Sequence, residues 1–153
     1  MVLRAVGHKQ SVCILQFIKQ RRDTGELAAL SHLPKVETHV CGQGFVRSGQ
    51  DAAARQAHVS AAQEGLLLAA EKLRDPTLAM VVLDEICGAM AAGLLTIASV
   101  REALAQATGP KIIILTGREA APELIELADT VSCIACVKHG WEQGWAAQKG
   151  VEL

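Results

Sequence analysis

Apolar runs of strand length alternate along the chain with segments in which apolar residues recur at helical spacing. We expect strands at 11–17, 36–40, 79–83, 111–116 and 129–137. We expect helices at 1–6, 23–33, 52–74, 99–107, 122–128 and 141–149, and a short irregular or helical link at 88–95. Alternating strands and helices of this kind form a parallel sheet with helices on both faces, so the pattern predicts an α/β fold.

Residues with strong backbone preferences support several of these boundaries. Asp51 is a good cap for the long helix, and Pro76 ends it. Ser99 and Glu102 have the spacing of a capping box and are expected to open the next helix. Pro122 suits the first turn of the helix that follows.

The strand at 79–83 ends abruptly in two adjacent carboxylates, Asp84 and Glu85. Ligands of open α/β sheets bind just beyond the carboxyl ends of the strands. Two carboxylates at such an edge suit Mg²⁺ on a nucleotide. A solvated strand end that caps the next helix explains the same residues, and on these residues alone the two interpretations weigh about equally.

Three further segments contain candidate ligand-binding residues. Arg118 follows Gly117 at another strand end and can grip phosphate oxygens, although in isolation a turn with a surface arginine is the simpler interpretation. Arg4 either meets a phosphate or stabilises a helix end, and the second use is favoured. The glycine-rich loop at 41–49 carries Phe45, which either faces a flat apolar ligand or folds back into the core.

The cysteines and histidines give a weaker signal. Cys133, Cys136 and His139 superficially resemble a metal site, but residues three apart on a straight strand point to opposite faces. Buried strand cysteines are the favoured interpretation. His32, His39 and His58 have no convergent partner in the sequence and are interpreted as structural or surface residues.

Composition narrows the class of protein. The chain has 153 residues, about one domain's worth, and 50% of them are hydrophobic. Its formal net charge of −1 gives no general attraction for nucleic acid or anionic membranes. No apolar run approaches the roughly 20 residues that span a bilayer, and residues 1–10 lack the apolar core of a secretory signal. We therefore expect a cytoplasmic protein with free thiols.

Taken in order, nine segments resemble the P-loop ATP:corrinoid adenosyltransferases, which act on cob(I)alamin or cob(I)yrinic acid a,c-diamide. These segments are 3–8, 12–19, 44–45, 81–86, 93–95, 115–118, 127–132, 137–139 and 147–153. The resemblance implies a RecA-like P-loop NTPase-type sheet in a single domain over 1–153. The family's first strand and its glycine-rich loop ending in Lys-Ser/Thr are missing from the sequence, so the domain is expected to be N-terminally truncated.

The resemblance also implies a reaction and its residues. In the family, Co(I) of the corrinoid attacks the 5′ carbon of ATP, triphosphate leaves and a cobalt–carbon bond forms. By position, Glu85 would serve Mg²⁺ with Asp84 beside it, while Arg4 and Arg118 would hold triphosphate oxygens. These assignments make Glu85 and Arg118 the expected catalytic residues.

The corrinoid side of the resemblance rests on Gly44 and Phe45, with Phe45 pressing on the lower face of the corrinoid. The aromatic residue that the family has two positions after Phe45 is Arg47 here, and the asparagine that commonly follows the Asp-Glu-Ile run is Cys87. ATP and a corrinoid are the expected partners, and a homodimer stays open. Two alternatives also stay open: a catalytically inactive corrinoid-binding or partner protein with this fold, and a generic α/β nucleotide-binding domain.

Overall fold

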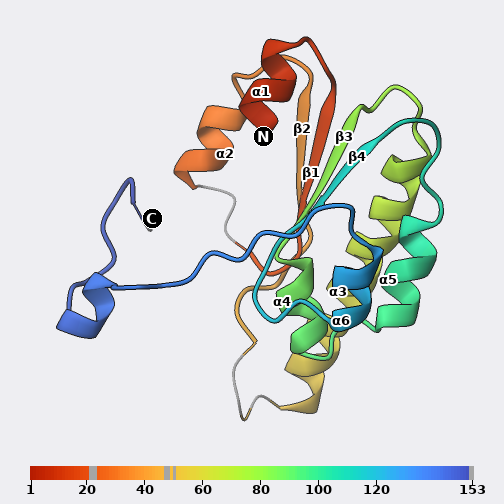
Figure 1. The fold of residues 1–153 in the computed structure, drawn as a ribbon. Helices are drawn as coiled ribbons and strands as arrows, with labels where there is room; N and C mark the ends of the chain where they lie inside the picture. Colours follow the sequence, from red (N-terminus) through yellow and green to blue (C-terminus); the bar gives the residue numbers. More distant parts are fainter. Residues whose placement is uncertain (21–23, 47–48, 50, 152–153) are drawn as a thin grey trace.

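The computed structural model describes residues 1–20, 24–46, 49 and 51–151, and its centre is a parallel four-stranded sheet (Figure 1). The strands are β1 (Val12–Gln16), β2 (Val36–Val40), β3 (Met80–Asp84) and β4 (Ile112–Leu115). Their order across the sheet is β2-β1-β3-β4, and each neighbouring pair is parallel. All carboxyl ends therefore meet at one edge of the sheet.

Burial follows the sequence pattern in β1 and β3 but not in β4, which was predicted as a buried strand. Every residue of β1 and the first four residues of β3 are buried, in agreement with their continuous apolar runs. All residues of β2 are half-buried, and β4 is half-buried except for exposed Ile112. The two central strands thus carry the core, and β2 and β4 are its borders within the described residues.

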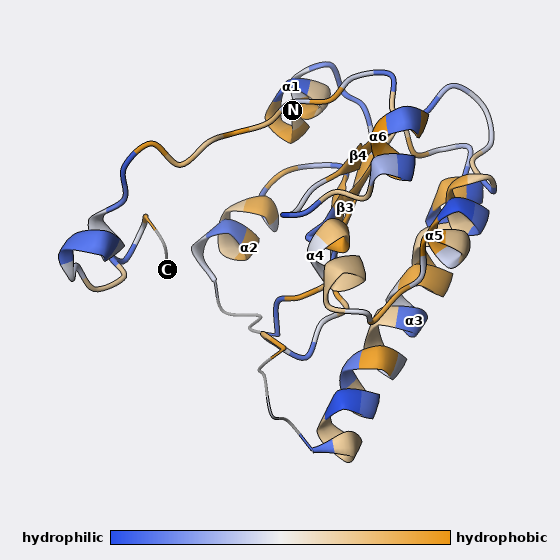
Figure 2. Cartoon of the chain, turned by 60° about the horizontal axis from the view of Figure 1, so that its bottom comes forward, coloured by the Kyte–Doolittle hydropathy of each residue, from blue (hydrophilic) through white to orange (hydrophobic). Residues whose placement is uncertain are grey.

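Helices cover both faces of the sheet, as Figure 1 shows. On one face α1 (Val2–Gly7) and α2 (Gly25–Leu30) pack on the apolar cluster that includes Val12, Ile14 and Met80. On the other face α3 (Ala52–Arg74) and α5 (Ile97–Leu104) cover the larger cluster that includes Leu15 and Leu83. Figure 2 shows the apolar character of β3 and β4 between these layers. The predicted α/β fold with a parallel sheet is confirmed.

Two short helices follow β3 and β4. The helix α4 (Ile86–Ala91) is separated from β3 by Glu85 alone, and the sequence indicated only an irregular or helical link that begins at residue 88. The helix α6 (Pro122–Leu127) follows β4 and buries only Leu124 among its residues. Pro122 stands in its first turn, as predicted.

The helix caps confirm one prediction and correct another. The side chain of Asp51 accepts a hydrogen bond of 2.7 Å from the backbone N–H of Ala54, so it caps α3 as expected. The predicted capping box of Ser99 and Glu102 is wrong. The cap of α5 is Thr96, and Ser99 is the third helical residue. The Thr96 hydroxyl accepts from the Ser99 N–H at 3.1 Å, and the Ser99 hydroxyl takes the reciprocal role that Glu usually fills.

The last two predicted elements are wrong. Residues 129–137 form no strand, and the side chains of Ile134 and Val137 are 96% and 94% exposed. The segment runs away from the sheet, and a short 3₁₀ helix, η1 (Gly140–Gln143), replaces the terminal helix (Figure 1). A strand needs backbone partners on a neighbouring strand, and residues 129–137 have none within the described residues.

The sequence also made predictions about membrane spans and about the cysteines. None of the described helices is both long enough and apolar enough to cross a membrane. All five cysteines are free thiols, as predicted, but Cys133 and Cys136 are exposed rather than buried in a strand. Their predicted burial fails because the strand that would have provided it does not form.

Candidate active site at the carboxyl edge of the sheet

Polar side chains converge where β1, β3 and β4 end. Gln16 and Asp84 are the last residues of β1 and β3 and are partners in the strand register. Thr116 follows β4 directly. We refer to Gln16, Lys19, Asp84, Glu85 and Thr116 as the carboxyl-edge cluster.

Asp84 is held from both neighbouring strands. Its Oδ1 accepts a hydrogen bond of 2.9 Å from the Thr116 hydroxyl. Its Oδ2 accepts a longer one of 3.4 Å from the Gln16 amide and lies 3.7 Å from the Lys19 ammonium. These contacts fix the orientation of the carboxylate before any ligand binds.

Glu85 adopts an unusual backbone conformation for a residue with a side chain. Its φ is +62°, in the left-handed region, which costs of order 1–3 kcal/mol. The turn is supported by a hydrogen bond of 3.0 Å from its N–H to the Thr116 hydroxyl. A Cβ added to Gly88 would lie 3.0 Å from Glu85 Oε2, so the carboxylate turns back over the start of α4. Thr116 therefore positions both acids.

Gly117 allows the strand end to approach α4 closely. Its φ is +132°, and a Cβ at this position would lie 2.8 Å from the backbone nitrogen of Gly88 and 2.9 Å from Cys87 Cβ. The carbonyl of Thr116 accepts from the N–H of Cys87 at 3.1 Å. A residue larger than glycine would push the β4 end away from the acids.

The chemistry of the cluster suits a hard divalent cation. Gln16 is only 2% exposed, and its Oε1 is buried without a hydrogen-bond partner among the residues that the structure describes. An unpaired buried oxygen is unfavourable unless something binds it. Asp84 and Glu85 add carboxylate oxygens, and Mg²⁺ prefers oxygen ligands. The donor set thus fits Mg²⁺.

Lys19 brings positive charge to the cluster. Its ammonium forms an ion pair of 2.8 Å with Glu26 in addition to its contact with Asp84. Burial acts to lower the pKa of Lys19, but the hydrogen bond to Glu26 and the charge of Asp84 raise it above its usual value. Lys19 therefore stays charged beside the acids at neutral pH.

Phe45 and Gly44 lie in the loop after β2, close to the segment that follows β1. The N–H of Gly44 donates to the carbonyl of Ile18 at 2.9 Å. Phe45 is 76% exposed, so it does not fold back into the core. Arg47, where the family has an aromatic residue, lies outside the described residues.

The two arginines are placed differently. Arg118 is exposed and follows Gly117 at the same edge as Asp84 and Glu85. Arg4 lies on α1, whose buried Ala5 packs with Val12 at the amino end of β1. Figure 1 shows α1 and α4 at opposite ends of the sheet. Arg118 thus lies at the same edge of the sheet as the acids, and Arg4 lies at the opposite end.

Sequence reasoning missed the positioning roles of Gln16, Lys19 and Thr116. A polar residue at the end of a buried strand was the signal that identified Asp84, and Gln16 carries the same signal at the end of β1. The sequence gives no comparable signal for Lys19 and Thr116, because the conformation of the loops after β1 and β4 sets the direction of their side chains.

Comparisons with known proteins agree with one another. The family model for ATP:corrinoid adenosyltransferase BtuR/CobO/CobP matches residues 1–153. A corrinoid adenosyltransferase from Pseudomonas aeruginosa is 40% identical over 154 residues, which cover 100% of this chain and 74% of that protein. Corrinoid adenosyltransferase CobA from Salmonella typhimurium is 37% identical over 149 residues, covering 97% and 74%.

A corrinoid adenosyltransferase from Sinorhizobium sp. is 34% identical over 156 residues, covering 100% of this chain and 72% of that protein. The match along the whole chain removes the generic nucleotide-binding domain as an alternative. The chain belongs to the ATP:corrinoid adenosyltransferase family.

Proposed function

We propose that the carboxyl-edge cluster is the place where this corrinoid adenosyltransferase holds the triphosphate of ATP with Mg²⁺. The observation that carries the proposal is the single hydrogen-bonded network that joins Asp84, Glu85 and Thr116 from two strand ends. Ligands of parallel sheets bind at this edge. The proposal concerns which residues act, since the family assignment already gives the reaction class.

In the reaction, the electron pair of Co(I) attacks the 5′ carbon of ATP. A cobalt–carbon bond forms, the bond from that carbon to oxygen breaks, and triphosphate leaves with the bonding electrons. Charge therefore gathers on the leaving group, and a bound Mg²⁺ would neutralise part of it. Glu85, Asp84 and Gln16 Oε1 are the oxygens we assign to that ion.

Cationic side chains complete the assignment. Lys19 lies within the network, and Arg118 stands exposed at the same edge. A guanidinium can donate two parallel hydrogen bonds to phosphate oxygens, so we assign Arg118 to the triphosphate. Arg4 stays a prediction from the family resemblance.

Phe45 is the candidate contact for the corrinoid. An exposed aromatic ring suits the flat, apolar face of a macrocycle. A backbone hydrogen bond from Gly44 to Ile18 joins the loop of Phe45 to the segment after β1, which supports a corrinoid contact near the carboxyl edge. The corrinoid site and the triphosphate site would then lie at the same edge of the sheet.

The test is a reaction of the purified chain with ATP, Mg²⁺ and cob(I)alamin under reducing, oxygen-free conditions. Formation of light-sensitive adenosylcobalamin is followed by absorption. We expect Asp84→Asn to lower kcat/KM by about 100-fold, the usual cost of removing one preorganised electrostatic group. Glu123→Gln, which changes an exposed acid on α6, serves as the matched control and should leave kcat/KM unchanged.

Each result has a definite meaning. Product formation by the unaltered chain with equal activity of Asp84→Asn would overturn the site assignment. No product from the unaltered chain, with corrinoid binding retained, would favour the catalytically inactive alternative. Phe45→Ala should raise the KM for the corrinoid by about tenfold and leave the KM for ATP unchanged, because one lost aromatic contact is worth roughly 1.4 kcal/mol.

A further inference from the structure

A second group of metal-ligating side chains lies away from the carboxyl edge, on the face of β1 and β2 that α3 covers. The strand register pairs Cys13 with Glu37, and His39 lies two residues beyond Glu37 on β2. Residues two apart on a strand share a face, so all three side chains point to the same side. One ligand atom from each lies within 4.8 Å of those of the other two.

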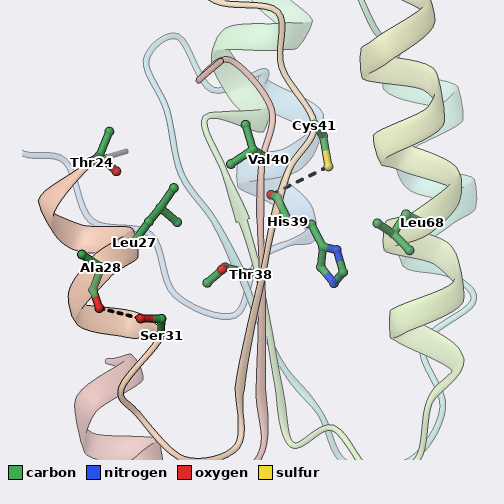
Figure 3. Close-up of a pocket in the computed structure, with 9 residues that line it drawn as sticks. All are labelled: Thr24, Leu27, Ala28, Ser31, Thr38, His39, Val40, Cys41 and Leu68. Atoms are coloured by element: carbon green, nitrogen blue, oxygen red, sulfur yellow. Dashed lines mark hydrogen bonds between the residues drawn. The ribbon is translucent and has the colours of Figure 1, made fainter. Parts of the chain in front are cut away.

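The nitrogen of His39 is the second observation at this place. Its Nε2 is buried, has no hydrogen-bond partner among the described residues and lies 3.5 Å from Glu37 Oε2. Figure 3 shows His39 and Cys41 on the α3 side of β2, toward Leu68, with Thr38 on the opposite side. The His39 nitrogen, the Cys13 sulfur and a Glu37 oxygen are close enough together for one ion to contact all three.

We propose that Cys13, Glu37 and His39 form a binding site for Zn²⁺. Sulfur, nitrogen and carboxylate oxygen are the three donor types that Zn²⁺ accepts, and harder ions such as Mg²⁺ disfavour a thiolate ligand. Three protein ligands leave a fourth position for water.

Binding of the ion changes the charge of the site by one unit. Zn²⁺ replaces the proton of the Cys13 thiol, which passes to solvent, and the thiolate and the Glu37 carboxylate oppose the two charges of the ion, while the Lys72 ammonium beside Glu37 leaves one net positive charge. Lys72 from α3 bonds Glu37 Oε2 at 2.9 Å, and a carboxylate has a second oxygen for the metal. Metal binding would supply the opposing charge that the thiolate needs.

The ion can reach the site from the border of the sheet. Cys13 is fully buried, but the side chains of Glu37 and His39 are 38% and 32% exposed along β2. The sequence shows only a superficial metal-site pattern, at Cys133, Cys136 and His139, where buried strand cysteines are the favoured interpretation. Within the described part of the chain, only Cys13, Glu37 and His39 bring three such ligand atoms together.

The experiment uses Co²⁺ as a spectroscopic probe of the full, metal-free chain, followed by displacement with Zn²⁺. We expect one equivalent of Co²⁺ to give a thiolate-to-metal absorption band that Zn²⁺ abolishes. The band should be absent in Cys13→Ser and should persist in the double variant Cys133→Ser/Cys136→Ser. A band that is lost only in the double variant, or no band at all, would overturn the proposal.

Because Cys13 lies in the core, its variant could fail to fold, and His39 provides an independent test. His39→Gln should weaken Co²⁺ binding by more than roughly tenfold, since loss of a direct ligand exceeds the effect of losing an outer partner. His32→Gln, an exposed histidine at the end of α2, is the matched control and should bind like the unaltered chain. Equal affinity of the His39 variant and the control would also overturn the site.

Discussion

The strand β1 and the segment 131–137 have similar apolar sequences but opposite surroundings. Residues 12–16 are all buried, whereas Val131, Ile134 and Val137 are 54%, 96% and 94% exposed. β1 is hydrogen-bonded to β2 on one side and β3 on the other. The segment 131–137 pairs with no strand in the described residues.

The difference shows that an apolar run is only one condition for a strand. A strand must also pair its backbone N–H and C=O groups and place its side chains under a covering helix. β1 meets both conditions, because it lies at the centre of the sheet and its odd-numbered residues face α3. The segment 129–137 meets neither, although its composition is equally suitable.

The largest expected change in stability comes from shortening one apolar side chain in each of the two segments. Leu15→Ala removes a fully buried side chain and should lower the free energy of unfolding by about 2–5 kcal/mol. Ile134→Ala should change it by less than about 0.5 kcal/mol, because little of that side chain is removed from water. Urea denaturation measures both. Similar losses for the two variants would show that residues 131–137 are packed in solution.

A second comparison uses two glycines, Gly117 at the carboxyl edge of the sheet and Gly150 in the segment after η1. Gly117 and Gly150 both have positive φ, +132° and +85°, so an alanine at either position is strained by of order 1 kcal/mol. Only Gly117 also lacks space, since its Cβ would press on the start of α4. Gly117→Ala should therefore cost about 1–3 kcal/mol more than Gly150→Ala.

Thermal unfolding and adenosyl transfer are the measurements for this glycine pair. The Gly117 variant should also lose activity, because the turn that it supports carries Thr116 and, through it, Asp84 and Glu85. If Gly117→Ala kept full activity, close packing of β4 against α4 would not be needed to position the acids.

The smallest expected effect concerns an ion pair. The hydrogen bond from Lys19 lowers the pKa of Glu26 below its ordinary value of 4.5. A lowered folded-state pKa gives stability that is present above pH 4.5 and is lost as the pH falls through the folded-state pKa. Both side chains are about 40% exposed, so Glu26→Gln should cost only about 0.3–1 kcal/mol at pH 7.

The stability difference between Glu26→Gln and the unaltered chain should shrink as the pH falls below 4.5, and denaturant titrations at several pH values measure it. Glu142→Gln in the tail is the control, with no expected change at any of these pH values. A difference for Glu26→Gln that stayed constant down to the pH of acid unfolding would contradict the linkage to the Lys19 ion pair.

The residues predicted from sequence were those whose role follows from their position on a strand. Asp84 and Glu85 were identified because an apolar run ended there, and the structure places both at the carboxyl edge. The supports of these acids were not identified. Thr116 acts on them from a strand distant in sequence, and only the alignment of β3 beside β4 brings it within 3 Å.

The surroundings of His39, in contrast, could not be predicted from the sequence. His39 had no convergent partner in the linear sequence, because Cys13 lies 26 positions before it and no local pattern connects them. Parallel pairing of β1 with β2 creates the proximity. Conversely, Cys133 and Cys136 looked related in sequence, but each is an exposed thiol on an unpaired segment.

The amino-acid sequence by itself determined the elements with local causes: the buried central strands, the long α3 with its Asp51 cap, and the order of strands and helices that makes the sheet parallel. Its motifs also determined the family. Tertiary structure alone decided that the apolar run at 129–137 did not become a strand, and which polar side chains come into contact. The physical reason is that strand pairing and side-chain convergence depend on backbone partners supplied by segments far away in the chain.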